Sequence, residues 1–208
     1  MSTRSALEAV PDRHDVLPAE EIVRRLRDPD RLARAEPTSS IDMQPGQPLV
    51  AAAVLVPLVL HPAPTVLLTL RTKKLSSHSG QVAFPGGRME PGESAEQAAL
   101  RESWEEIGLG PTLPRVMGRL PDHLTGTGYR VTPVVALLQP PLKLVPEPGE
   151  VELIFEYDLQ RLLDPAQPRR EQLEVRGEQR SYWVWPHERH FVWGATAAIL
   201  RNLALVLR

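Results

Sequence analysis

Cysteine is absent from this 208-residue sequence. The chain therefore has no disulfide, no thiolate zinc site and no cysteine nucleophile. An excess of basic charge is missing as well: the net charge is −2, which argues against duplex nucleic acid as a partner. Long hydrophobic runs are also lacking, since the longest, residues 49–60, contains Pro57 and falls short of the ~20 residues that span a bilayer. We therefore expect a buried strand there and no membrane partner.

The N-terminal region separates from the remainder by composition. Its first 13 residues are polar and charged, so they predict no signal peptide, and a cytoplasmic location is expected by default. One helix is predicted at Glu20–Arg27, followed by a flexible linker rich in proline and polar residues at 36–48. We therefore divide the chain into an N-terminal helix with its linker, residues 1–48, and one larger domain, residues 49–208.

A helix with clear start and stop signals is predicted between Ser94 and Gly108. Ser94 and Gln97 have the spacing of a capping box, which marks the helix N-terminus. Alanines and a leucine then favour helix propagation. Gly108 ends the helix, because glycine accepts the left-handed conformation common at helix ends.

Three carboxylates share one face of this helix. Glu102 lies three residues before Glu105 and four before Glu106, and side chains at those spacings project together. Like charges so placed repel unless a cation sits among them, and hard oxygen ligands suit Mg²⁺ or Mn²⁺. The preceding turn, Phe84–Gly87, bends sharply and permits close approach of the backbone to a ligand such as a pyrophosphate. The plain alternative is a solvated acidic helix after an ordinary loop.

The remaining pattern is one of short apolar segments between turns. A helix after Ser94, a terminal helix and several strands together indicate an α/β/α sandwich with a mixed β-sheet between helices. The first two expected strands, Val50–Leu60 and Thr65–Arg71, form a hairpin, and a second hairpin joins Leu173–Arg176 to Ser181–Trp185. The other expected elements are strands at Arg115–Leu120, Tyr129–Leu138 and Val151–Tyr157 and a terminal helix at Ala195–Leu207.

Residues 87–109 resemble the signature box of the Nudix hydrolases, G-x5-E-x7-R-E-U-x-E-E-x-G-U, in which U is aliphatic. Ser103 is the one departure, at the first U position. The matching residues are Gly87, Glu93, Arg101, Glu102, Glu105, Glu106, Gly108 and Leu109. The resemblance implies the Nudix α/β/α sandwich and hydrolysis of a diphosphate joined to another group.

A second resemblance lies just upstream, at residues 67–87. The segment is similar to the extra motif of the coenzyme A pyrophosphatase branch, LLTxR-[SA]-x3-R-x3-G-x3-FPGG. Thr72 replaces the serine or alanine conservatively, whereas Ser76 stands where the motif has an arginine. The matches are Leu67, Leu68, Thr69, Arg71, Gly80, Phe84, Pro85, Gly86 and Gly87. This likeness implies cleavage of coenzyme A to 3′,5′-ADP and 4′-phosphopantetheine.

The resemblance also implies roles for individual residues. Glu102 and Glu106 are the expected principal ligands of Mg²⁺ or Mn²⁺, and Glu105 is a further ligand or orients water. The Gly86 carbonyl is a candidate backbone ligand. A salt bridge between Glu93 and Arg101 is expected to fix the loop on the helix.

Substrate-binding residues and the general base stay open. Arg71 and Arg88 flank the expected site, where they either contact phosphate oxygens or form part of a solvated basic strip. His78 either binds phosphate or caps the loop. Glu147 and Glu150 are candidates for the general base, against the alternative that both are solvated loop carboxylates.

Three functional interpretations follow. The first is a metal-dependent diphosphatase acting on coenzyme A or acyl-CoA. The second is a Nudix diphosphatase acting on ADP-ribose, a sugar nucleotide or a nucleoside triphosphate, which Ser76 favours. The third is a ligand-binding regulator without catalysis, which the intact carboxylate face disfavours. The partner is in each case a small molecule, and a homodimer stays open.

Overall fold

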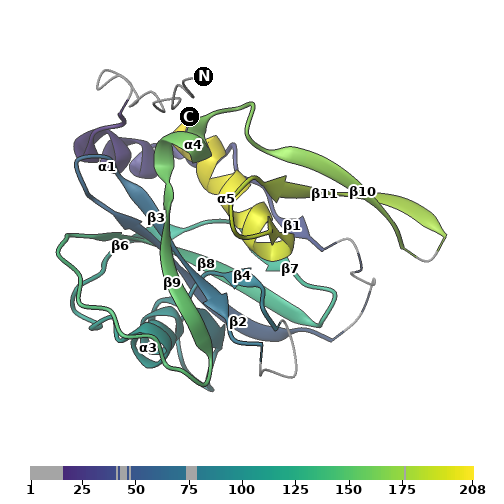
Figure 1. Ribbon diagram of the computed structural model, residues 1–208, viewed down its shortest axis with the longest axis horizontal. Coiled ribbons are helices and arrows are strands. Elements are labelled where there is room, and N and C mark those ends of the chain that lie inside the picture. The colour runs from purple at the N-terminus through teal and green to yellow at the C-terminus, as the bar shows by residue number, and fades with distance from the viewer. Residues whose placement is uncertain (1–15, 41, 43–45, 47, 74–78, 176) are drawn as a thin grey trace, which may run out of the picture.

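The computed structural model describes residues 16–208 except 41, 43–45, 47, 74–78 and 176. A mixed sheet, nine-stranded over these residues, forms its centre (Figure 1). The strands are β1 (Thr38–Ser39), β2 (Val50–Val59), β3 (Thr65–Arg71), β4 (Val82–Ala83), β5 (Gly86–Arg88), β6 (Arg115–Arg119), β7 (His123–Leu124), β8 (Tyr129–Leu138) and β9 (Val151–Asp158). β2 runs parallel to β8 along its whole length, and β3 runs antiparallel to β9.

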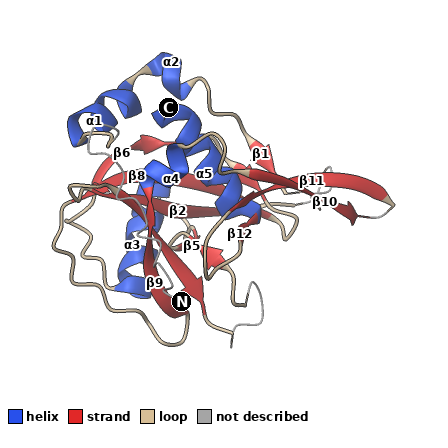
Figure 2. Cartoon of the chain, turned by 45° about the horizontal axis from the view of Figure 1, so that its top comes forward, coloured by secondary structure: helices blue, strands red, loops and turns tan. Residues whose placement is uncertain are grey.

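Helices cover both faces of this sheet (Figure 2). Helix α3 (Ala95–Ile107) packs on one face, while α5 (Gly194–Leu207) and α1 (Ala19–Arg27) cover the other. Alternate residues of β2 point to opposite layers, as strand geometry requires: Leu55 packs with α3, and Val56 with α5. The structure confirms the predicted α/β/α sandwich.

The N-terminal helix joins the core of the larger domain. Ile22 and Leu26 are buried in the cluster that contains α5. After the short helix α2 (Pro29–Leu32), part of the predicted linker forms β1, which pairs in parallel with β7. The division of the chain at residue 48 stays a prediction.

The strongly patterned elements were predicted best. β3 and β8 have the expected bounds, and the second hairpin is present but longer than expected, with β10 at Arg169–Val175 and β11 at Glu178–Trp185. The short elements α4 (Leu159–Leu163) and β12 (Val192–Trp193) were missed, since so few residues carry no periodic signal. Over the described residues, no helix is both long and apolar enough to cross a membrane.

Candidate active site

Glu106 is the most buried carboxylate of the predicted metal-binding face. Its side chain is 3% exposed, and each of its two oxygens has a different hydrogen-bond donor. The Gly86 backbone N–H donates to Oε2 at 3.0 Å, and Arg71 Nη1 lies 3.3 Å from Oε1. Burial raises the pKa of Glu106 to about 7, and the neighbouring charges of Glu150 and Glu102 add to this effect. The carboxylate is thus fixed in position and electrostatically destabilised in its charged form.

Glu102 lies against the glycine turn one helical turn earlier. A Cβ atom added to Gly87 would stand 2.5 Å from the carboxyl carbon of Glu102, so a larger residue at this position would displace the Glu102 carboxylate. Burial, followed by the charges of Glu105 and Glu150, raises the pKa of Glu102, although Arg101 opposes the shift. Glycine at 87 therefore lets the backbone reach the carboxylate face closely.

Arg101 joins the loop before α3 to the helix itself. Its Nε and Nη2 donate to the two oxygens of Glu93 at 2.8 and 3.0 Å, which confirms the predicted salt bridge. Nη2 also donates to the Arg88 carbonyl at 3.0 Å, while Nη1 contacts Glu102 at 2.9 Å and the more exposed Glu105 at 3.2 Å. The arginine lowers the pKa of Glu93 to about 2. This side chain thus fixes the loop and also neutralises part of the carboxylate face.

The two predicted substrate-binding arginines differ in placement. Arg71, at the end of β3, contacts Glu106 directly. Arg88 instead donates from Nε and Nη2 to the Tyr129 hydroxyl, at 3.0 and 2.7 Å, so its side chain is directed toward β8. Tyr129 was not anticipated as its partner, because the pairing joins residues far apart in sequence. His78 lies outside the described residues.

The turn after β8 brings one candidate base toward the site. The Glu147 backbone N–H donates to the Glu106 carbonyl at 2.8 Å, but its carboxylate accepts from Gly149 N–H at 3.3 Å within its own turn. The charge of Glu150 raises the pKa of both Glu102 and Glu106, which places Glu150 within electrostatic reach of them. Of the two candidates, Glu150 therefore has the stronger connection to the site.

Comparisons with known proteins identify the family of the chain. A family model described as the NUDIX domain matches residues 49–193. NudL of Escherichia coli K12, an uncharacterized Nudix hydrolase, is 43% identical over 155 residues, which cover 74% of this chain and 81% of NudL. The chain belongs to the Nudix family. The Nudix hydrolase RenU of M. smegmatis has 26% identity and a TM-score of 0.48, over 58% of this chain and 84% of RenU. DR0079 of Deinococcus radiodurans shares the fold, with a TM-score of 0.51 at 14% identity over 77% of this chain and 87% of DR0079.

Nudix hydrolases generally use divalent metal cations and act on nucleoside diphosphate derivatives. Among the described residues, no three histidine, aspartate or glutamate side chains are already grouped as a metal centre. Arg101 donates hydrogen bonds to Glu102 and Glu105, while Glu106 accepts from Gly86 and Arg71. The donor chemistry nevertheless fits a hard cation, since carboxylates that raise one another's pKa gain from a shared positive charge. A cation here would compete with Arg101 for Glu102.

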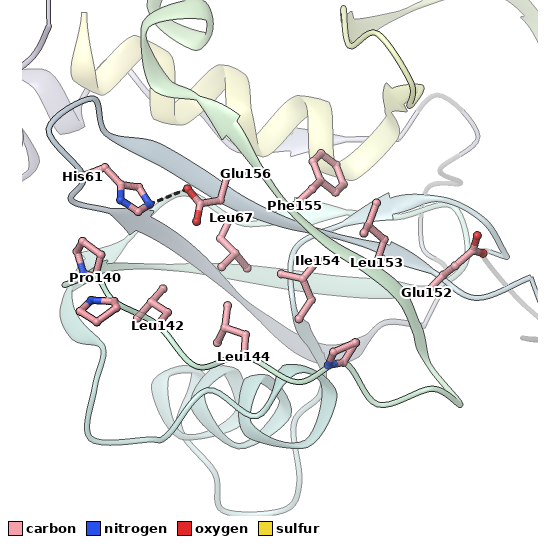
Figure 3. A pocket seen from close by; sticks show the side chains of 12 residues that line it. His61, Leu67, Pro140, Leu142, Leu144, Glu152, Leu153, Ile154, Phe155 and Glu156 are labelled. Atoms are coloured by element: carbon pink, nitrogen blue, oxygen red, sulfur yellow. Dashed lines mark hydrogen bonds and ion pairs between the residues drawn. The ribbon is translucent and has the colours of Figure 1, made fainter.

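The structure contains a largely apolar groove of about 820 Å³ (Figure 3). Its walls are β9 and the segment that follows β8, with Leu67 of β3 at the base and Leu142, Leu144 and Ile154 around it. At one end His61 Nε2 lies 2.9 Å from Glu156. This Nudix hydrolase therefore has space for an apolar group beside β9. No local sequence pattern indicated the groove, because distant segments form it.

Proposed function

We propose that this Nudix hydrolase is a Mg²⁺- or Mn²⁺-dependent diphosphatase that cleaves coenzyme A or acyl-CoA to 3′,5′-ADP and 4′-phosphopantetheine or its acyl derivative. The observation that carries the proposal is the contact between Arg71 and Glu106 at 3.3 Å. Arg71 belongs to the motif similar to the coenzyme A branch, and Glu106 to the Nudix box. The contact joins the two motifs in one site.

The chain's own residues have separable roles in this reaction. The cations would be held by Glu102, Glu105 and Glu106, with the Gly86 carbonyl as a candidate further ligand. Bound there, they would neutralise the diphosphate and lower the pKa of a bound water. Arg71 Nε is buried without a hydrogen-bond partner in the described structure, but the side chain as a whole is 22% exposed, so the exposed part of this cation can meet a phosphate oxygen.

Proton transfer is assigned to Glu150. Its charge acts on Glu102 and Glu106, as a base that activates water beside the carboxylate face must. Arg88, bound to the Tyr129 hydroxyl, is available at the rim of the site for a more distant anionic group.

The apolar groove supports a substrate that carries an apolar arm. Its lining includes Pro146 and Glu152, which flank the turn bearing Glu150 in the sequence. A pantetheine or acyl chain would bury apolar surface there, worth roughly 25 cal/mol per Å². The polar groups of ADP-ribose or a nucleoside triphosphate gain less from such a wall. The groove therefore favours coenzyme A and its thioesters over those alternatives.

A substrate panel tests the proposal. Coenzyme A, an acyl-CoA, ADP-ribose, a sugar nucleotide and a nucleoside triphosphate are incubated with the protein and Mg²⁺ or Mn²⁺, and the products are identified by mass. We expect 3′,5′-ADP from both coenzyme A substrates, with ¹⁸O from labelled water on a phosphate of one product. Release of free fatty acid or inorganic phosphate would assign a different bond and overturn the proposal.

The same panel separates the other interpretations. If ADP-ribose or a nucleoside triphosphate is cleaved and coenzyme A is not, the second interpretation, a Nudix diphosphatase with another substrate, is correct; Ser76 favours that interpretation. Binding without cleavage of any compound would select the regulator. Ser76 lies outside the described residues, and we predict that Ser76→Arg raises kcat/KM for coenzyme A while changing that for ADP-ribose little. The cytoplasmic location also stays a prediction.

A further inference from the structure

The β10–β11 hairpin projects away from the α/β/α body, on the face opposite α3 (Figure 1). It belongs to a separate three-stranded sheet in which β11 lies between β10 and β12. β10 and β11 pair without a register shift from Arg169 opposite Val184 to Val175 opposite Glu178. Along the described chain, β10 is therefore a regular edge strand with one side of its backbone unpaired.

This edge has only one of the usual protections against strand pairing, namely charge, and its charges are of both signs. Natural proteins block exposed edges with charged side chains, lysine above all, or with proline, bulges or a covering segment. β10 has the sequence RREQLEV, which contains neither proline nor lysine, and its pairing with β11 shows no bulge. Every residue of β10 except Val175 is exposed, and Leu173 is 48% exposed. The strand is thus open along its backbone and partly apolar.

The charges of β10 complement a second copy of the same strand. In an antiparallel pair centred on Gln172, Arg170 of each copy faces Glu174 of the other. Residues directly opposite approach within about 5 Å at their Cβ atoms, so the pair gains two opposite-charge contacts. The two Leu173 side chains become diagonal neighbours on the other face, within contact range for large side chains. Centring the pair on Glu171 would instead set that carboxylate against itself.

We propose that β10 is the dimerisation strand of this protein, and that its partner is β10 of a second copy, paired antiparallel about Gln172. The two hairpin sheets then form one continuous sheet across the two-fold axis. The contact is isologous, since each copy offers Arg170 and Glu174 to the same residues of the other. The carboxylate faces on the two α3 helices stay accessible, because they lie away from the hairpin.

Charge reversal tests the register directly. We expect the wild type to dimerise in sedimentation velocity over a concentration series. Arg170→Glu and Glu174→Arg each replace two attractive pairs with two repulsive ones, so each is expected to weaken the dimer by about one to two orders of magnitude. The two variants mixed together should form a heterodimer of near wild-type affinity, because both pairs become attractive again. Arg169→Glu is the matched control, since Arg169 faces Val175 in this register.

Several results would overturn the proposal. They are a wild type that stays monomeric across the series, single variants that dimerise like the wild type, and a mixture that fails to recover. Recovery in the mixture also controls for the loss of the Arg170 contacts with Trp183 and Ser181 within each hairpin. Diphosphatase activity per chain should match the wild type in all variants, which shows that the body remains folded.

Discussion

Protonation of His123 is expected to make the fold less stable in mild acid. The imidazole is 1% exposed and lies in β7, where Nδ1 contacts Thr38 Oγ1 at 2.8 Å and Nε2 contacts Ser40 Oγ at 3.1 Å. These contacts join the N-terminal segment to the central sheet. Burial lowers the pKa of His123 to about 4, and the nearby charge of Asp42 opposes this only in part.

The direction and the size of this pH effect on stability follow from the lowered pKa of His123. Between pH 6.5 and about 4 the unfolded chain binds a proton at His123 that the folded chain does not, so stability falls as the pH falls. At 1.36 kcal/mol per pKa unit, the full loss amounts to about 3 kcal/mol. Glu106 has the opposite slope, because its raised pKa of about 7 means that the metal-free fold binds the extra proton.

The measurement must therefore isolate His123. Urea unfolding of the wild type and of His123→Gln is compared from pH 7.5 to pH 4 in the presence of a chelator. Glu106 contributes equally to both proteins, so it cancels in the difference between their unfolding free energies. We expect that difference to change by about 3 kcal/mol in favour of the variant as the pH falls. A difference that is constant across this range would refute the assignment of a buried, neutral His123.

Two further predictions concern the carboxylate face. Glu106→Gln and Glu102→Gln are expected to lower kcat/KM for the cleaved diphosphate by at least about two orders of magnitude. Glu96→Gln should retain wild-type activity, because Glu96 pairs with Arg119 and not with the carboxylate face; equal losses at all three positions would contradict the assignment. Gly87→Ala should raise the metal concentration needed for half-maximal activity about 10- to 100-fold, because its Cβ would overlap the Glu102 carboxylate. Gly110→Ala, where a Cβ meets only Leu113 at ordinary contact distance, is the control, and unchanged metal dependence in Gly87→Ala would argue against Glu102 as a ligand.

Local patterns were sufficient for the helix that carries the site. The capping box at Ser94 and Gln97 is present, and Gly108 ends α3 with a left-handed φ of 66°. Ser103, the misfit in the Nudix box, is fully buried, and its hydroxyl donates to the Ala99 carbonyl at 2.6 Å. The helix backbone thus satisfies the polar group, and a small serine fills a position that the family pattern gives to an aliphatic residue.

Contacts between residues far apart in the sequence could not be predicted from local patterns. The sequence offered Glu147 and Glu150 equally as bases. In the folded turn the Glu147 carboxylate accepts a hydrogen bond within its own loop, while the charge of Glu150 raises the pKa of Glu106. The extent of β10 was underestimated for a different reason. Its faces are both exposed, so no alternation of polar and apolar residues marks its start at Arg169. Tertiary contacts determine both the surroundings of Glu147 and Glu150 and the extent of β10, and local periodicity does not report such contacts.

Arg101 shows why the loop and the carboxylate face must be considered together. Its guanidinium binds Glu93 and the Arg88 carbonyl on the loop side, and Glu102 and Glu105 on the helix side. A cation bound to Glu102 would remove one helix-side partner but leave the loop-side bonds in place. The arginine would then hold the glycine turn against α3 while the cation replaces it as the counter-charge. The same residue can thus support the metal-free fold and position the loop for the substrate diphosphate.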